Sequence, residues 1–159
     1  MMSLREHTVC FTGHRKIPPE QQEKVVRQLR KTILELAGDE YRYFGAGGAL
    51  GFDTLAAQTV LNLKSDLPQI RLILVLPCLS QSDRWRSRDK EIYETIKARA
   101  DKIVYTSREY TRGCMHKRNR HLVDSSSVCV CYLKDATGGT AYTVKYARSK
   151  NLRIINIAE

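Results

Sequence analysis

The chain has 159 residues, enough for one domain of ordinary size that buries a core without disulfides or a structural metal. Its 42% hydrophobic and 28% charged residues exclude a disordered chain, and its apolar runs are too short to span a membrane. The formal net charge of +10 favours anionic partners, a class that includes phosphorylated small molecules and nucleic acids alike.

Short apolar runs alternate with amphipathic stretches from the start of the chain. A strand is predicted over residues 7–12, and a helix over 18–38 is opened by two prolines and ended by a glycine. A second strand over 41–45 precedes a helix over 52–64. The continuous apolar run 71–76, which ends at a proline, is typical of a strand buried on both faces.

The same alternation continues to the end of the chain. The remaining predicted elements are a helix over 84–100, a strand over 102–105, a helix over 115–125, a strand over 127–133, a helix over 140–150 and a strand over 153–157. Within the helix over 84–100, Trp85, Ile92 and Ile96 are expected to face inward.

Strands that alternate with helices predict an α/β fold. We expect residues 1–159 to form a single Rossmann-like domain, with a doubly wound, mostly parallel six-stranded sheet and helices on both faces. The strand order 3-2-1-4-5-6 suits this rhythm. Sheets of this kind bind ligands beyond the carboxyl ends of their strands, so residues just after strands are the candidates for a site.

The first candidate segment follows the first strand directly. Gly13 allows the backbone to turn sharply and to approach a ligand closely. Arg15 offers a planar fork of donors that suits a phosphate or a carboxylate. His14 is either a general base or a hydrogen-bonding residue of the loop.

The second segment, residues 45–53, places four glycines within seven residues before a helix. Backbone N–H groups at Gly47, Gly48 and Gly51 are expected to form an anion site with the helix dipole. Asp53 either caps that helix or binds a ribose hydroxyl. The segment is neither the GxGxxG motif of a dehydrogenase nor a P-loop. This argues against a dehydrogenase and against an ATPase.

Two further strand ends carry polar residues. After the third strand, Gln81 is a candidate ligand contact, while Trp85 either stacks on a base or anchors its helix to the core. In the basic stretch before the fifth strand, Arg118 is a candidate phosphate contact. The nearby cysteine and histidines lack the paired spacing of a structural zinc site, so no metal is expected.

A second short glycine turn follows the fifth strand. Gly138, Gly139 and Thr140 lead straight into the next predicted helix, where exposed N–H groups and a hydroxyl form a second anion cradle. Either turn alone could be an ordinary capped turn. Two such turns after strands of one sheet indicate a pocket for a nucleotide or a dinucleotide-like ligand.

Five motifs occur in an order that resembles the YpsA-like proteins of the SLOG superfamily, which is related to the LOG nucleotide hydrolases and the DprA DNA-processing proteins. They are Thr12-Gly13-His14-Arg15, the stretch from Gly47 to Asp53, Pro77-Cys78 with Gln81 and Trp85, Arg118-Asn119-Arg120 with Asp124, and Gly138-Gly139-Thr140. The resemblance covers nearly the whole chain. It implies a Rossmann-like fold and a nucleotide pocket that includes Gly51, Asp53 and the second glycine turn.

One departure bears on catalysis. LOG-type hydrolases carry a catalytic glutamate just after their glycine motif, and here no glutamate follows Thr140 until the last residue. We therefore expect binding or sensing of a phosphate ligand, with two alternatives: N-glycosidic hydrolysis that uses Asp53 as the catalytic acid, and binding of DNA or RNA. The sequence leaves open whether the chain forms a homo-oligomer.

Cysteine usage points to a compartment. The chain has five cysteines, an odd number, and the first residues are polar and charged rather than those of a secretory signal. A reducing cytoplasm is therefore the expected location.

Overall fold

The computed structural model describes residues 3–159 and contains one six-stranded sheet, in which every pair of neighbouring strands is parallel. The strands are β1 (Thr8–Gly13), β2 (Tyr43–Ala46), β3 (Arg71–Leu76), β4 (Lys102–Tyr105), β5 (Val128–Tyr132) and β6 (Arg153–Asn156). The predicted α/β class, with a Rossmann-like parallel sheet of six strands, is confirmed.

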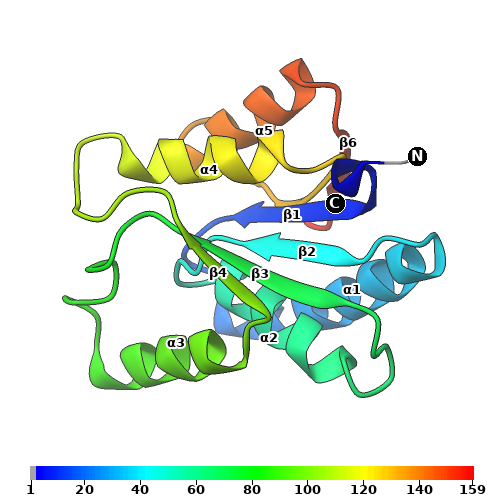
Figure 1. Cartoon of the computed structure of the whole chain (residues 1–159), viewed down its shortest axis with the longest axis horizontal. Coiled ribbons are helices and arrows are strands. Elements are labelled where there is room, and N and C mark those ends of the chain that lie inside the picture. The colour runs from blue at the N-terminus through cyan, green and yellow to red at the C-terminus, as the bar shows by residue number, and fades with distance from the viewer. Residues whose placement is uncertain (1–2) are drawn as a thin grey trace.

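Helices connect these strands and cover both faces of the sheet. They are α1 (Pro19–Gly38), α2 (Phe52–Leu63), α3 (Ser87–Arg99), α4 (Cys114–Asp124) and α5 (Gly139–Ser149). Figure 1 shows α1, α2 and α3 on one side of the sheet and α4 and α5 on the other. A short 3-10 helix, η1 (Leu4–His7), precedes β1 and was not predicted.

The predicted strand order was wrong. The order is β4-β3-β2-β1-β5-β6, so β5 and not β4 lies beside β1. The chain extends the sheet in one direction from β1 to β4, and then crosses to the other side of β1. Because crossovers between parallel strands are right-handed, this reversal places α4 and α5 on the face opposite α1–α3.

The physical reason lies in β4, which forms the edge of the sheet beside β3, and in β5, which lies inside the sheet between β1 and β6. Every residue of β5 is buried, as expected of a strand with a neighbour on each side in a parallel sheet covered on both faces. In β4, Lys102, Ile103 and Tyr105 are exposed, which fits a strand at the edge of the sheet. The Val-Cys-Val-Cys run of β5 already distinguishes it from β4 in the sequence.

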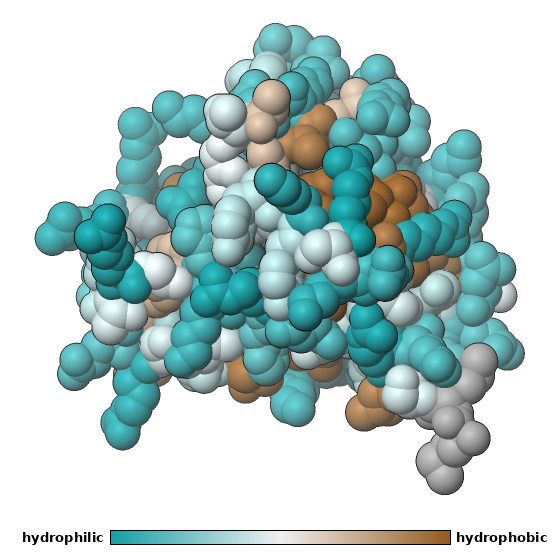
Figure 2. All heavy atoms as spheres, turned by 90° about the horizontal axis from the view of Figure 1, so that it is seen from above, coloured by the Kyte–Doolittle hydropathy of each residue, from teal (hydrophilic) through white to brown (hydrophobic). Residues whose placement is uncertain are grey.

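The core has two parts because strand side chains alternate between the faces of the sheet. On the α1–α3 face, Phe11 packs against Phe44 and Phe52, with ring centroids 6.2 and 6.3 Å apart. On the opposite face, Cys10 and Cys129 pack beneath α4 and α5. Seen from the side of α4 and α5, the surface is mostly hydrophilic with smaller hydrophobic patches (Figure 2).

The third helix begins later than predicted. Residues before Ser87 form turns instead, in which Asp83 N–H donates to the Ser80 carbonyl and Trp85 N–H donates to the Ser82 carbonyl. Trp85 therefore belongs to the loop after β3, although it still packs in part against the core, as expected.

Candidate functional site

A cavity of about 390 Å³ lies at the carboxyl edge of the sheet, between the ends of β1 and β5. We call it the central cavity. This is the place where the strand order reverses, and doubly wound sheets hold their ligands there. Its walls come from the loop after β1, the glycine-rich segment before α2, the first turns of α4 and the turn before α5.

The register of β1 and β5 brings two of these walls together. Gly13 is aligned with Tyr132, so both chains leave the sheet side by side. His14 then links the two loops, because its Nε2 accepts the N–H of Lys134 at 2.9 Å and that of Asp135 at 3.3 Å. A nitrogen that accepts these bonds carries no proton, so the Nδ1 tautomer of a neutral imidazole fits this geometry.

The carboxylate of Asp135 lies 3.9 Å from the same nitrogen of His14. An ion pair between them requires a proton on Nε2, and that proton would displace both backbone N–H donors. The neutral, loop-joining histidine is therefore the arrangement that these contacts favour. It leaves Nε2 of His14 occupied and not free to take a proton from a ligand.

The turn before α5 is open. Gly138 and Gly139 are exposed, and a Cβ added at either position would meet no atom of residues 3–159 within 4 Å. Gly138 has a φ of +103°, a conformation in which side-chain-bearing residues are strained. No side chain in the described part of the chain caps α5, so the N–H groups of its first turn lack a capping partner there and form the positive end of the helix dipole.

Other groups of the protein occupy the space beside the glycines of the segment before α2. A Cβ on Gly47 would lie 2.5 Å from the Arg118 guanidinium. On Gly48 it would lie 2.7 Å from Leu76, and on Gly51 it would lie 2.3 Å from the backbone of Arg15. These three glycines thus allow protein groups to approach the backbone closely.

Asp53 lies in the first turn of α2, with only 7% of its surface exposed. Its Oδ2 accepts the N–H of Ala49 at 3.3 Å, and no side chain caps α2, so Asp53 secures the glycine-rich segment instead of the helix. Burial raises the pKa of the Asp53 carboxyl, and the nearby Arg118 and Arg15 guanidinium groups oppose that rise.

Arg118 is also buried, with 3% of its surface exposed. Its guanidinium donates to the Gly47 carbonyl and to Oδ1 of Asn119, the latter at 2.7 Å, and one terminal nitrogen lies 3.7 Å from the sulfur of Met115. Burial lowers the pKa of Arg118, and the charge of Asp53 raises it. The two groups partly balance each other beneath the central cavity.

Arg15 differs from Arg118 in its surroundings. It is exposed, and its guanidinium makes no hydrogen bond or ion pair with any residue between 3 and 159. Arg15 lines the central cavity. Its positive charge forms no ion pair with a carboxylate of the described chain.

The structure brings most of the predicted site residues to the central cavity. They are Gly13, His14, Arg15, Asp53, Arg118, Gly138, Gly139 and Thr140. Gly47, Gly48 and Gly51 do not line it, and Gln81 lines a different cavity. All positions named as candidates thus lie at the carboxyl edge, but not in one pocket.

Several further residues line the cavity although they were not predicted as ligand contacts. They are Thr12, Ala49, Met115, His116, Asn119, Asp135 and Thr137. Most of them are neighbours in the chain of residues that were named, and Met115 lies one helical turn before Arg118. His116 packs at a tilt against Tyr142 of α5, with ring centroids 4.4 Å apart and 56° between the ring planes, a contact between two helices that periodicity cannot reveal.

The chain matches the YpsA family, described as the YspA SLOG family, over residues 10–157. It belongs to this family. A UPF0398 protein of Bacillus pumilus is 28% identical to this SLOG protein over 125 residues, which cover 77% of this chain and 67% of the relative. A UPF0398 protein of Brevibacillus brevis is 25% identical over 129 residues.

Two solved structures of DNA processing protein A share the fold of this SLOG protein. The structure from Helicobacter pylori, which was described for its mode of binding single-stranded DNA, has a TM-score of 0.66 at 22% identity and covers 92% of this chain. The one from Streptococcus pneumoniae has a TM-score of 0.68 at 14% identity and covers 95%. The chain spans 63% and 50% of those two chains, respectively.

Residues 3–159 contain neither a helix that could span a membrane nor a cluster of potential metal ligands. No helix there has the length and apolarity needed to cross a membrane. No cluster of three or more His, Cys, Asp or Glu side chains in that range could hold a metal ion.

Proposed function

We propose that this SLOG protein binds a nucleotide or a nucleotide-derived ligand through its phosphate groups in the central cavity. The observation that carries the proposal is the open turn at Gly138 and Gly139, which presents uncapped N–H groups at the start of α5 in the same cavity as Arg15. Backbone donors, a helix dipole and a free guanidinium together suit a phosphate.

The charge of the cavity supports the same ligand class. Asp53 and Arg118 offset each other beneath it, and Arg15 makes no ion pair with residues 3–159, so one guanidinium is available to an anionic ligand. The net charge of +10 adds a long-range attraction for anions. The family membership places the protein among SLOG proteins, which is compatible with such a ligand.

The contacts favour binding over turnover. A general base needs an accessible atom that can take a proton, and Nε2 of His14 already accepts two backbone N–H groups. Asp53, the candidate acid for N-glycosidic hydrolysis, is buried and accepts the Ala49 N–H. We therefore assign Asp53 a positioning role for the glycine-rich segment.

Thermal denaturation tests the binding proposal. AMP, NAD and inorganic pyrophosphate at millimolar concentration are expected to raise Tm, because a ligand that binds only the folded state stabilises it. Adenosine, which lacks a phosphate, serves as the matched control and should give a much smaller shift. No shift with any of the phosphate compounds would overturn the proposal.

Product analysis tests the hydrolytic alternative. After incubation with nucleoside monophosphates and NAD, chromatography is expected to show no released base. Release by the wild-type protein that is lost in Asp53→Asn would instead establish Asp53 as a catalytic residue. The substitution keeps the shape of the side chain, so its effect reports on the acid itself.

Binding of single-stranded DNA is the second candidate. It is favoured by the exposed cations near the start of α4, Arg112 and Lys117, and by the fold shared with DNA processing protein A. Retention of a labelled oligonucleotide should then fall steeply as salt rises, since released counterions drive such binding. Failure to retain it at low salt would remove this candidate.

We also propose a reducing location, the cytoplasm. All five cysteines are free and buried, which is the state expected where disulfides do not form. Quantification of free thiols in protein denatured directly from cells would check this, with five per chain as the expected result.

A further inference from the structure

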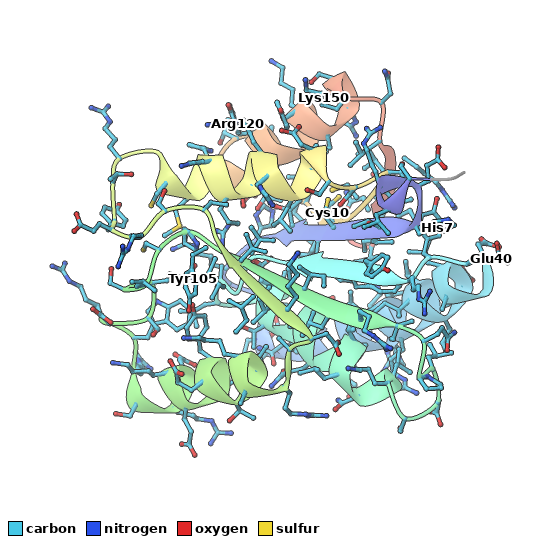
Figure 3. All side chains as sticks on the ribbon, in the orientation of Figure 1. His7, Cys10, Glu40, Tyr105, Arg120 and Lys150 are labelled. Carbon is cyan, nitrogen blue, oxygen red and sulfur yellow. The ribbon has the colours of Figure 1, made fainter. Side chains whose placement is uncertain are left out.

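A second cavity, of about 500 Å³, lies beside the central one at the carboxyl edge. We call it the outer cavity. The loops after β3 and β4 and the first turn of α4 build its walls, and Met115 lines both cavities. Figure 3 shows Tyr105 at the end of β4, on the side of the molecule where these loops gather, and His7 and Glu40 at the opposite edge.

The walls of the outer cavity combine aromatic rings with a flexible thioether. Trp85 packs edge-to-face on Tyr93, with centroids 5.0 Å apart, so its indole is held against the core while it lines the cavity. Tyr110 stands at the rim with 67% of its surface exposed. Exposed aromatic rings beside a methionine offer a surface on which a planar group can stack.

Gln81 adds a polar group that lacks a partner. Its Nε2 donates to the Tyr93 hydroxyl at 3.1 Å, whereas its Oε1 is buried and accepts no hydrogen bond from residues 3–159. Turning the amide over would only exchange the two atoms, so one of them stays unpaired either way. A buried polar atom without a partner in a cavity wall is the position that a polar ligand atom would satisfy.

The glycine-rich segment connects the two cavities. A Cβ on Gly47 would meet Arg118, which holds Met115 at the shared wall, and a Cβ on Gly48 would lie 3.3 Å from the Gln81 amide. The loops are also tied to each other, because Leu79 N–H donates to the Arg108 carbonyl at 3.1 Å. The two cavities therefore belong to one continuous framework.

We infer that the outer cavity binds the planar nitrogenous base of the nucleotide whose phosphate lies at Gly138 and Gly139. Aromatic rings supply stacking, and the unpaired amide of Gln81 supplies a hydrogen bond to the edge of the base. The bound ligand then extends past Met115, from the central cavity into the outer cavity. This inference rests on the proposed function, because it assumes that the central cavity takes the phosphate.

The chain's single tryptophan makes the inference directly measurable, since Trp85 lines the outer cavity. Each of the four nucleoside monophosphates is titrated while Trp85 fluorescence is recorded, with ribose 5-phosphate as the base-free match and free tryptophan amide as the control for absorption. At least one nucleotide should quench Trp85 saturably, with the Kd that calorimetry gives. Ribose 5-phosphate should bind without quenching.

Substitutions provide the second arm of the experiment. Tyr110→Ala and Gln81→Met should each weaken nucleotide affinity, Tyr110→Ala by at least about fivefold, the lower end of the cost of a lost base-stacking contact. Neither should change affinity for ribose 5-phosphate. Leu79→Ala is the matched control, because Leu79 is exposed in the same loop but does not line the outer cavity.

The two proposals fail in different ways. If nucleotides and ribose 5-phosphate bind equally well, with Trp85 unquenched and both variants unchanged, the base lies elsewhere and this inference is overturned while the phosphate site stands. If neither nucleotides nor ribose 5-phosphate bind in calorimetry, the proposed function fails and this inference fails with it.

Discussion

The two glycine turns resemble each other in sequence, yet they are used in opposite ways. Gly47 and Gly48 are buried, and the protein's own side chains occupy the space that a Cβ would need. Gly138 and Gly139 are exposed, and no atom from residue 3 onward lies within 4 Å of that space. The first turn is therefore part of the framework, whereas the second is a surface left open for something outside the chain.

The strongest expected contrast is between Gly51→Ala and Gly138→Ala. Both positions have positive φ, so each alanine costs about 1–3 kcal/mol in backbone strain. Only at Gly51 does the new methyl also collide with backbone, that of Arg15. We expect a loss of about 4 kcal/mol or more for Gly51→Ala, measured by urea unfolding. Equal losses at the two positions would contradict the comparison.

A second contrast involves no unusual backbone conformation. Gly47→Ala displaces the buried Arg118 guanidinium and should cost about 1–3 kcal/mol of unfolding free energy, the range for overpacked interiors. Gly139→Ala meets no neighbour and should stay within about 0.5 kcal/mol of the wild type. Urea midpoints measured side by side decide the matter, and a destabilised Gly139→Ala would show that the second turn is packed after all.

Arg15→Ala tests whether the open turn and its neighbouring guanidinium bind a ligand together. The guanidinium of Arg15 touches no described partner, so its loss should leave Tm nearly unchanged. Affinity for AMP should fall about tenfold, as when one charge-assisted hydrogen bond is lost. Lys16→Ala is the control, because Lys16 is the exposed neighbour that does not line the central cavity. Equal losses in both variants would indicate a general effect of net charge.

Asp53→Asn tests how the Asp53 carboxyl contributes to the stability of the glycine-rich segment before α2. Because burial raises the pKa of Asp53, the folded chain binds its proton more tightly than the unfolded chain does. The associated stability is complete below the ordinary carboxyl pKa and is lost as pH rises through the raised value. The unfolding free energy of the wild type relative to Asp53→Asn should therefore fall between acidic and neutral pH. A difference that rises with pH would have the wrong sign.

Most of the fold could be predicted from the sequence. Apolar runs located all six strands, and the bounds of β3 and β4 were predicted to the residue. The strand order was missed because alternation alone does not say where the chain changes direction. The types of side chain in the two strands indicate their places in the sheet, although the alternation of strands and helices does not. Lys102 of β4 is exposed, as at an edge, and the centre of β5 is wholly apolar, as inside the sheet.

The site was predictable in place but not in detail. Positions after strands identified Gly13, Arg15 and Gly138, which the structure brings to one cavity. Glycine content could not tell which turn is open, because the group that fills the space, the Arg118 guanidinium, comes from 71 residues away. The role of His14 depends on two backbone N–H groups more than a hundred residues further along the chain.

Calorimetric titration of Gly139→Ala with AMP tests most directly whether the second turn is the phosphate site. Gly38→Ala, at the exposed end of α1, is the matched control, because its added methyl also meets nothing within 4 Å. Both variants should keep the wild-type Tm. We predict that Gly139→Ala weakens binding at least about tenfold while Gly38→Ala binds as the wild type does. Unchanged affinity in Gly139→Ala would contradict the account.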